Sequence, residues 1–471
     1  MRDFIKSFLA FGLATSIQKL LGFILLPIFT RYFSTSEFGV LDLLNSLLSI
    51  LSMFAILQLE TSLQRYFYEY NKLKRRILIS NIFFLVGLLS IILCIAIVIF
   101  ARHISLLIFN TNIYVSHISL VAVQVPLNNI GMLALVILRF KKENLKFLVA
   151  IIVNVLLTMF FVYLFLVNLN FGLLGIIVAQ TIASTISTIV LINFIKKDFL
   201  IKLSKNIIIK SLLYAIPQFP ARIGSMIISQ SSRFFILGFL SIGTVGIYSL
   251  SDKFASAIQL VNTAFIMAWT PFMFSQFKNK NNTNIFLHSF PIVCSVVFLC
   301  VIYISILSKE IIILATTKAY YDAYRYVGGL ALFYSLYIIK EVIDIGPKIR
   351  EKTKYLTLTF FCTVIVNVML LYILVRLFDV KGVVISMIIT NIFLVLMSWY
   401  ISNKLYYIPH SILQFIYLLL PSLVIGLSQM YIEISLITRL TIGLASTFYY
   451  CLFIIKYYRK LKLFQSLELL T

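Results

Sequence analysis

The chain has 471 residues, of which 61% are hydrophobic and 12% are charged, and its mean hydropathy is +1.03. Soluble domains are typically about 45–50% apolar and about 25% charged, and their interiors cannot hold this much apolar surface. A soluble enzyme or binding module is therefore excluded. A formal net charge of +24 would suggest nucleic acid in a soluble protein, but basic cytoplasmic loops explain it in a membrane protein, so we expect no nucleic-acid partner.

Apolar segments long enough to cross a bilayer as helices, about 20 residues each, follow one another along the whole chain. They are unbroken, whereas the strands of an outer-membrane barrel would alternate apolar and polar residues. We predict an all-α polytopic membrane protein with about fourteen transmembrane helices. The predicted spans are residues 7–29, 38–60, 77–101, 117–139, 147–168, 172–195, 208–231, 244–270, 285–307, 326–346, 355–376, 382–402, 411–430 and 435–455.

Basic residues gather in alternate loops, at 72–76, 139–146, 196–210, 278–280, 348–354 and 456–462. The intervening loops 168–171 and 239–243 have none. Because cytoplasmic loops carry the excess of Lys and Arg, this alternation predicts that both termini lie in the cytoplasm. The five cysteines and four histidines show no metal-ligand spacing, and we expect no metal or other cofactor.

Two pairs of similar segments indicate an internal repeat. Residues 30–50 resemble 237–258, with Gly39 opposite Gly246 at an offset of 207, and residues 171–180 resemble 380–389, with Gly175 opposite Gly382 at the same offset. The offset spans six helices, an even number, so the two halves should run parallel. We predict six-helix lobes at 1–200 and 201–404, followed by two extra helices and a cytoplasmic tail at 405–471.

The seventh span carries polar residues at helical spacing, which should place them on one wet face. Pro217 and Pro220 should bend this helix near its cytoplasmic half. The residues of the stripe are Tyr214, Gln218, Arg222, Ser225, Ser229 and Arg233.

Ionisable residues within spans are costly and mark substrate or ion pathways. Several spans carry them, and Lys340 and Asp344 are spaced as an i, i+4 pair. Cations outnumber acids, which favours an anionic cargo, and Arg suits phosphate geometry in particular. The candidate substrate-binding residues are Arg222, Arg233, Lys19, Lys253, Gln218 and Lys340. The candidates for coupling to H+ or Na+ are Asp42, Asp252, Glu341 and Asp344.

Four segments resemble those of Wzx-type polysaccharide flippases, in the multidrug/oligosaccharidyl-lipid/polysaccharide exporter superfamily. They are TRYFSTSEFGVLDL (30–43), LLYAIPQFP (212–220), RFFILGFLSIGTVGIYSLSDKFA (233–255) and the Trp-x-Pro-Phe run at 269–272. The family often has an acid before the residue that matches Arg233, whereas this chain has Ser232. We therefore expect no local Asp–Arg pair there.

The resemblance implies a flippase for an undecaprenyl-diphosphate-linked oligosaccharide repeat unit of O-antigen or capsule, working by alternating access through a basic central cavity. It implies the bacterial cytoplasmic (inner) membrane, with membrane lipid, a polysaccharide polymerase and a chain-length regulator as candidate partners. It also implies a transporter and not an enzyme.

Two alternatives remain open. The cargo could be a peptidoglycan precursor or a teichoic-acid-type lipid of the same superfamily. A polytopic polysaccharide polymerase or transferase is less favoured, because the longest outer loop, near 308–325, is short for such chemistry. A drug-cation exporter is disfavoured by the excess of cations within the spans.

Overall fold

The computed structural model describes residues 17, 21–200, 202–276, 282–350, 352 and 354–468. These residues form helices, turns and loops, and within them no strand occurs. Nine helices of this part of the chain are long and apolar enough to cross a membrane, and two shorter apolar helices join them, Leu21–Tyr32 and Ile412–Ser428. The predicted all-α polytopic class is therefore confirmed.

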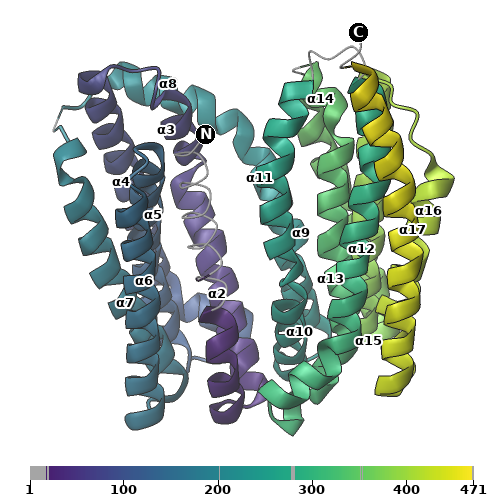
Figure 1. Ribbon diagram of the computed structural model, residues 1–471. Coiled ribbons are helices and arrows are strands. Elements are labelled where there is room, and N and C mark those ends of the chain that lie inside the picture. The colour runs from purple at the N-terminus through teal and green to yellow at the C-terminus, as the bar shows by residue number, and fades with distance from the viewer. Residues whose placement is uncertain are drawn as a thin grey trace. The chain divides into compact units, whose positions relative to one another are not determined.

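The chain divides into two compact units, Met1–Ile223 and Gly224–Thr471 (Figure 1). The first contains α2 (Thr35–Ile56), α3 (Leu59–Tyr66), α4 (Lys72–Phe109), α5 (Val115–Phe140), α6 (Asn144–Val162), the π-helical η1 (Tyr163–Asn168), α7 (Gly172–Ile195), η2 (Lys196–Asp198), α8 (Lys205–Ala215), η3 (Ile216–Gln218) and the start of α9 (Phe219–Phe239). The second contains the rest of α9, then α10 (Ile242–Ala255), α11 (Ile258–Gln276), α12 (Asn282–Ala315), η4 (Lys318–Ala323), α13 (Tyr324–Ile343), α14 (Ile345–Ile349), α15 (Lys354–Leu405), α16 (Ile412–Ser428) and α17 (Leu436–Glu468).

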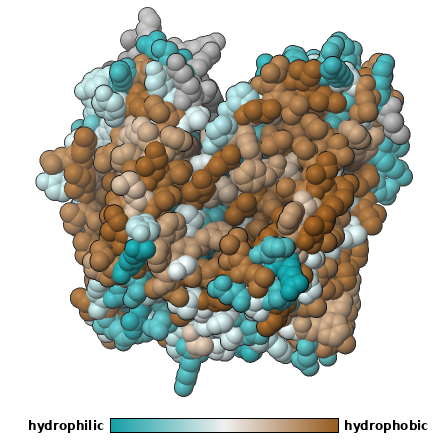
Figure 2. All heavy atoms as spheres, turned by 180° about the vertical axis from the view of Figure 1, so that it is seen from behind, coloured by the Kyte–Doolittle hydropathy of each residue, from teal (hydrophilic) through white to brown (hydrophobic). Residues whose placement is uncertain are grey.

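Each unit buries apolar side chains between its helices and leaves other apolar side chains exposed. In the first unit the core includes Leu59, Leu78, Leu133 and Ile151. In the second, α13 is the most enclosed of the candidate spans and packs against α10, α12, α15 and α16. Figure 2 shows apolar residues over most of one face, with polar residues gathered near the helix ends. This distribution is the one that a lipid environment requires.

The repeat predicted from sequence has matching local structure in the two units. Ser34 caps the start of α2 by accepting a hydrogen bond from the Glu37 amide, and Ser241 caps α10 by accepting one from the Thr244 amide. The two caps are 207 residues apart, the offset that the sequence predicts. Each helix therefore begins at the corresponding position of its half.

The second repeat pair lies at a tight turn in both units. Gly172 lies three residues before Gly175 and has a φ of 58°, and Asp379 lies three residues before Gly382 and has a φ of 51°. A Cβ added at Gly175 would lie 2.9 Å from the Phe171 Cβ, and one at Gly382 would lie 1.8 Å from the Leu374 carbonyl oxygen. Only glycine permits this approach, which explains why the two residues occupy equivalent places.

Several polar spans are interrupted. The second span breaks at Leu57 and Gln58, both with positive φ, and the eighth breaks between α10 and α11. The seventh is interrupted by the 3-10 turn η3, which contains Pro217. Interrupted helices free backbone groups for ligands, and transporters use them at binding sites.

His410 lies between α15 and α16, where its ring contacts Phe290 and Trp399 at centroid distances of 4.7 and 5.9 Å. Both ring nitrogens are covered, and neither has a hydrogen-bond partner in the described part of the chain. Burial lowers the pKa of His410 from its ordinary value near 6.5 to about 4. The folded protein therefore favours the neutral imidazole over its charged form.

We expect acid to destabilise the protein through His410. Because its folded-state pKa is depressed, its contribution is fully present above the unfolded-state pKa and is lost as the pH falls towards the folded-state value. Within about pH 6.5 to 4, the free energy of unfolding should fall by about 1.4 kcal/mol per pH unit. Thermal unfolding of the detergent-solubilised protein across this range measures the slope. His410→Phe should flatten it, and an unchanged slope in that variant would refute the assignment.

Candidate functional site

A buried ion pair joins α9 to α10 in the second unit. Arg233 Nη2 lies 2.7 Å from Asp252 Oδ2, and both residues are almost fully buried. The Tyr334 hydroxyl on α13 donates to Asp252 Oδ1 at 2.7 Å, and Arg233 Nη1 donates to the Ser229 carbonyl oxygen at 3.1 Å. Both carboxylate oxygens of Asp252 are thus bonded by protein donors.

This geometry gives Arg233 an acid partner that the sequence did not predict. The acid does not precede Arg233 in sequence, where Ser232 stands, but comes from the following helix. The positive charge of Arg233 is therefore balanced within the protein.

A second charged cluster lies at the end of α13 and in α14. Lys340 and Asp344 form the predicted i, i+4 ion pair, and both are nearly inaccessible. Lys340 Nζ also lies 3.4 Å from Glu341 Oε1, while Lys348 Nζ lies 2.8 Å from Glu341 Oε2. Two cations face two acids, so this cluster is formally neutral.

Arg222 differs from these paired cations. It lies near the start of α9, its side chain is exposed, and within the described chain it forms neither a hydrogen bond nor an ion pair. The buried Glu60 of α3 lies within electrostatic range of it. Arg222 is therefore the candidate cation whose hydrogen-bonding capacity stays open to a ligand.

The stripe predicted for the seventh span is only partly correct. Arg222, Ser225, Ser229 and Arg233 lie on one continuous helix, α9. Tyr214 precedes the break and packs against Tyr66, with ring centroids 5.7 Å apart, beside the apolar core of the first unit. Tyr214 therefore packs against the apolar core and is separated by the break at η3 from the polar residues of α9.

The other candidate residues are Gln218, Asp42, Lys253 and Lys19. The Gln218 amide donates to the Tyr214 carbonyl oxygen at 2.9 Å, while Asp42 and Lys253 are half-buried on α2 and α10. Lys19 lies outside the described residues. The structure thus joins Arg233 to Asp252, and Lys340 to Glu341 and Asp344. Their roles in substrate binding and ion coupling stay predictions.

An uncharged hollow in the first unit was not predicted from sequence. It has a volume of about 330 Å³ and lies between α5, α6 and α7. None of the described residues that line it is charged. Its polar lining consists of Asn128, Asn154, Ser184, Ser187 and Thr188. Asparagines near the middle of apolar spans could have indicated this hollow. An interpretation based on charged residues alone does not include them.

The walls of this hollow are held by hydrogen bonds between helices. The Asn154 amide donates to Ser187 Oγ at 3.0 Å, and the Thr188 hydroxyl donates to the Leu127 carbonyl oxygen at 3.1 Å. These bonds join α6 to α7 and α7 to α5. No group of three or more His, Cys, Asp or Glu residues that could hold a metal gathers in the described parts of either unit.

Comparisons with known proteins agree with this architecture. Residues 4–277 match the sequence pattern of the family described as polysaccharide biosynthesis protein. A comparison with curated protein sequences finds no match.

Three solved structures share the fold. The lipid II flippase MurJ in its inward closed conformation is 16% identical, with 96% of this chain and 99% of that chain covered and a TM-score of 0.72. An inward-facing MATE multidrug transporter of the MOP superfamily is 14% identical over 82% of this chain and 94% of its own, with a TM-score of 0.66. A variant of the Vibrio cholerae MATE transporter VcmN is 11% identical over 86% and 96%, with a TM-score of 0.58. At these identities the likeness establishes the fold.

Proposed function

Because the chain belongs to the polysaccharide biosynthesis protein family, we propose that it moves a lipid-linked glycan across the membrane. The cargo of this proposal is an undecaprenyl-diphosphate-linked oligosaccharide repeat unit, carried from the cytoplasmic to the outer leaflet. The sugar and diphosphate cross through the protein by alternating access, while the polyprenyl tail stays in lipid. The family match and the transporter fold shared with MurJ and MATE proteins support it.

The observation that carries the choice of an anionic lipid is Arg222. A guanidinium without a protein partner in a spanning segment is costly unless a ligand or water satisfies it. A diphosphate offers the planar, bidentate acceptors that Arg matches best. Two other candidate cations, Arg233 and Lys340, already face acids. The proposal therefore assigns the diphosphate contact to Arg222.

The proposal includes a membrane location, partner proteins and an ion gradient as the energy source. The protein resides in the bacterial cytoplasmic (inner) membrane with both termini in the cytoplasm, as its loop charges indicate. It hands its cargo to a polysaccharide polymerase and a chain-length regulator that assemble O-antigen or capsule. Coupling to H+ or Na+ involves the acids Asp42, Asp252, Glu341 or Asp344.

A second cargo is favoured by one comparison. The similarity to the lipid II flippase MurJ covers nearly the whole of both chains, which supports a peptidoglycan precursor or a related lipid-linked glycan. Both cargoes contain a polyprenyl diphosphate, so Arg222 does not separate them. The sugars attached to the diphosphate do.

Purified protein in liposomes tests the function directly. Vesicles would contain undecaprenyl-diphosphate trisaccharide with a fluorophore on the glycan, and a membrane-impermeant reductant would quench the label in the outer leaflet. We expect the protein to expose the inner-leaflet label as well. Quenching no greater than in protein-free vesicles would refute the proposal, and faster transport of labelled lipid II would favour the second cargo.

A further inference from the structure

The uncharged hollow of the first unit, from here on called the pocket, lies level with the middle of three helices. Asn128, Asn154 and Ser184 each lie near the middle of their helices, α5, α6 and α7. The volume of about 330 Å³ is near the lower end of the range for ligand pockets, about 300–1,000 Å³. The pocket therefore has room for one part of a large cargo.

Asn128 indicates that this pocket is wet or occupied by a polar ligand. Its side chain is exposed where it lines the pocket, and within the described chain it makes no hydrogen bond with protein. A lipid tail offers an amide no hydrogen-bond partner, and an unsatisfied polar group in hydrocarbon costs several kcal/mol. A purely lipid-facing position would thus disfavour asparagine.

The other walls present both donors and acceptors. Asn154 and Ser187 form a fixed pair, and Thr188 is anchored to the Leu127 carbonyl oxygen. Gly131 lies beside them, and a Cβ added there would sit 3.5 Å from Thr188 Oγ1 and 3.7 Å from Leu191 Cδ1. The missing side chain at Gly131 leaves space open beside the hydroxyl.

We propose that this pocket binds an uncharged sugar residue of the lipid-linked glycan, an inference that rests on the proposed function. Amides and hydroxyls can both donate and accept, as sugar hydroxyls do. None of the described residues of the lining is a cation that could pair with a diphosphate. A polyprenyl tail offers its amides and hydroxyls no hydrogen-bond partner. The sugar is thus recognised apart from the diphosphate, and Asn128 is its contact that lacks a protein partner.

Binding of two defined lipids separates the sugar from the rest of the cargo. The probes are undecaprenyl diphosphate and undecaprenyl-diphosphate N-acetylglucosamine, measured by native mass spectrometry of the full chain in nanodiscs. We expect the wild type to prefer the sugar-bearing lipid. Asn128→Leu should reduce that preference roughly tenfold, the effect of one well-placed hydrogen bond, and leave the affinity for undecaprenyl diphosphate unchanged.

Gly131→Ala is a second test that should fold normally, because its added methyl group makes only ordinary contacts. It should also weaken the sugar preference, whereas Gly87→Ala on α4, where nothing lies within 4 Å, should not. Equal losses for both lipids, or an unchanged preference in both pocket variants, would overturn the sugar assignment alone. Failure of the wild type to bind either lipid would instead overturn the proposed function, and the sugar site with it.

Discussion

Replacing Arg233 with methionine will lower the free energy of unfolding by about 3–5 kcal/mol, the cost of leaving one member of a buried ion pair without its partner. Asp252 would keep its hydrogen bond from Tyr334 but lose the cation 2.7 Å from Oδ2. A buried carboxylate without a counter-charge is costly to hold. Thermal or chemical unfolding of the solubilised protein measures the loss.

The double variant Arg233→Met/Asp252→Leu is the informative comparison. Removing both charges should recover much of the stability, so the two single losses will not add. Arg65→Met is the matched control, because Arg65 and Glu69 form an exposed pair worth at most about 1 kcal/mol. Additive losses in the double variant would show that the two side chains act independently.

Replacing Arg222 with alanine will reduce transport of the labelled glycan lipid by about ten- to a hundredfold, with little effect on membrane insertion. The expected loss corresponds to a charge-assisted hydrogen bond to the cargo, worth about 1.5–3 kcal/mol. Arg222 is exposed and has no hydrogen-bond partner in the described chain. Its removal therefore breaks no internal hydrogen bond.

Two further variants test whether Arg222 acts through its charge or through its bidentate geometry, and whether the effect is specific to this arginine. Arg222→Lys should retain more transport than alanine if charge dominates, and as little as alanine if the bidentate geometry dominates. Arg376→Ala serves as a control, because Arg376 stacks on Tyr372 and Phe239 at 4.0 and 4.6 Å and should be dispensable for transport. Wild-type transport by Arg222→Ala would remove this residue from the cargo path.

The fold could be predicted because its causes are local. About 20 apolar residues in succession form a helix in a bilayer, since a helix satisfies all backbone hydrogen bonds within the one segment. Pro217 likewise interrupts its helix through its own ring, and Gly175 and Gly382 are found where a Cβ would collide with the preceding helix. Each of these features depends on neighbours in sequence.

The pairing of charges could not be predicted, because it depends on how helices turn towards one another. Arg233 and Asp252 lie on different helices, α9 and α10, and sequence alone does not say which faces meet. The hydrogen bond from Tyr334 could not be predicted either, because Tyr334 lies on a third helix, α13. The uncharged pocket could not be predicted, because asparagine, serine and threonine are common in membrane helices, where they bond to the backbone or to neighbouring helices.

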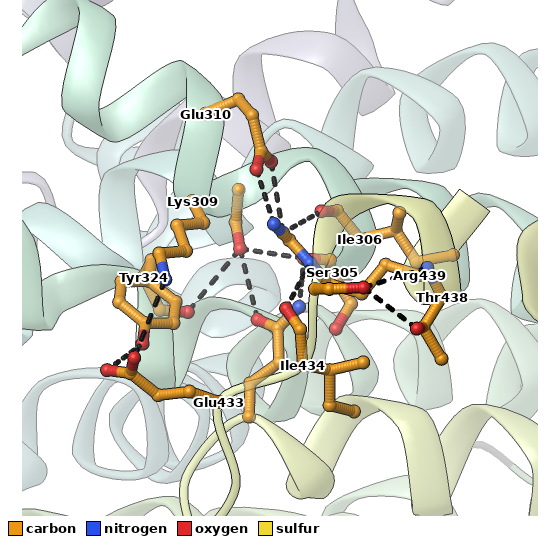
Figure 3. A network of polar contacts seen from close by, with 12 residues as sticks. Ser305, Ile306, Lys309, Glu310, Tyr324, Glu433, Ile434, Thr438 and Arg439 are labelled. Carbon is orange, nitrogen blue, oxygen red and sulfur yellow. Dashed lines mark hydrogen bonds and ion pairs between the residues drawn. The ribbon is translucent and has the colours of Figure 1, made fainter.

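Within the second unit, a polar network joins α17 to α12 (Figure 3). Arg439, at the start of α17, is buried and forms an ion pair with Glu310 of α12. Arg439 Nη1 also donates to the Ile306 carbonyl oxygen at 2.6 Å, and Nε donates to the Ile434 carbonyl oxygen at 3.1 Å. The guanidinium is thus held by partners on both elements that it joins.

This network has a consequence for biosynthesis. Glu310 precedes Arg439 in the sequence, so the carboxylate and the Ile306 carbonyl that hold the guanidinium are synthesised before the arginine. As α17 packs against α12, Arg439 can pair with acceptors that the chain already contains.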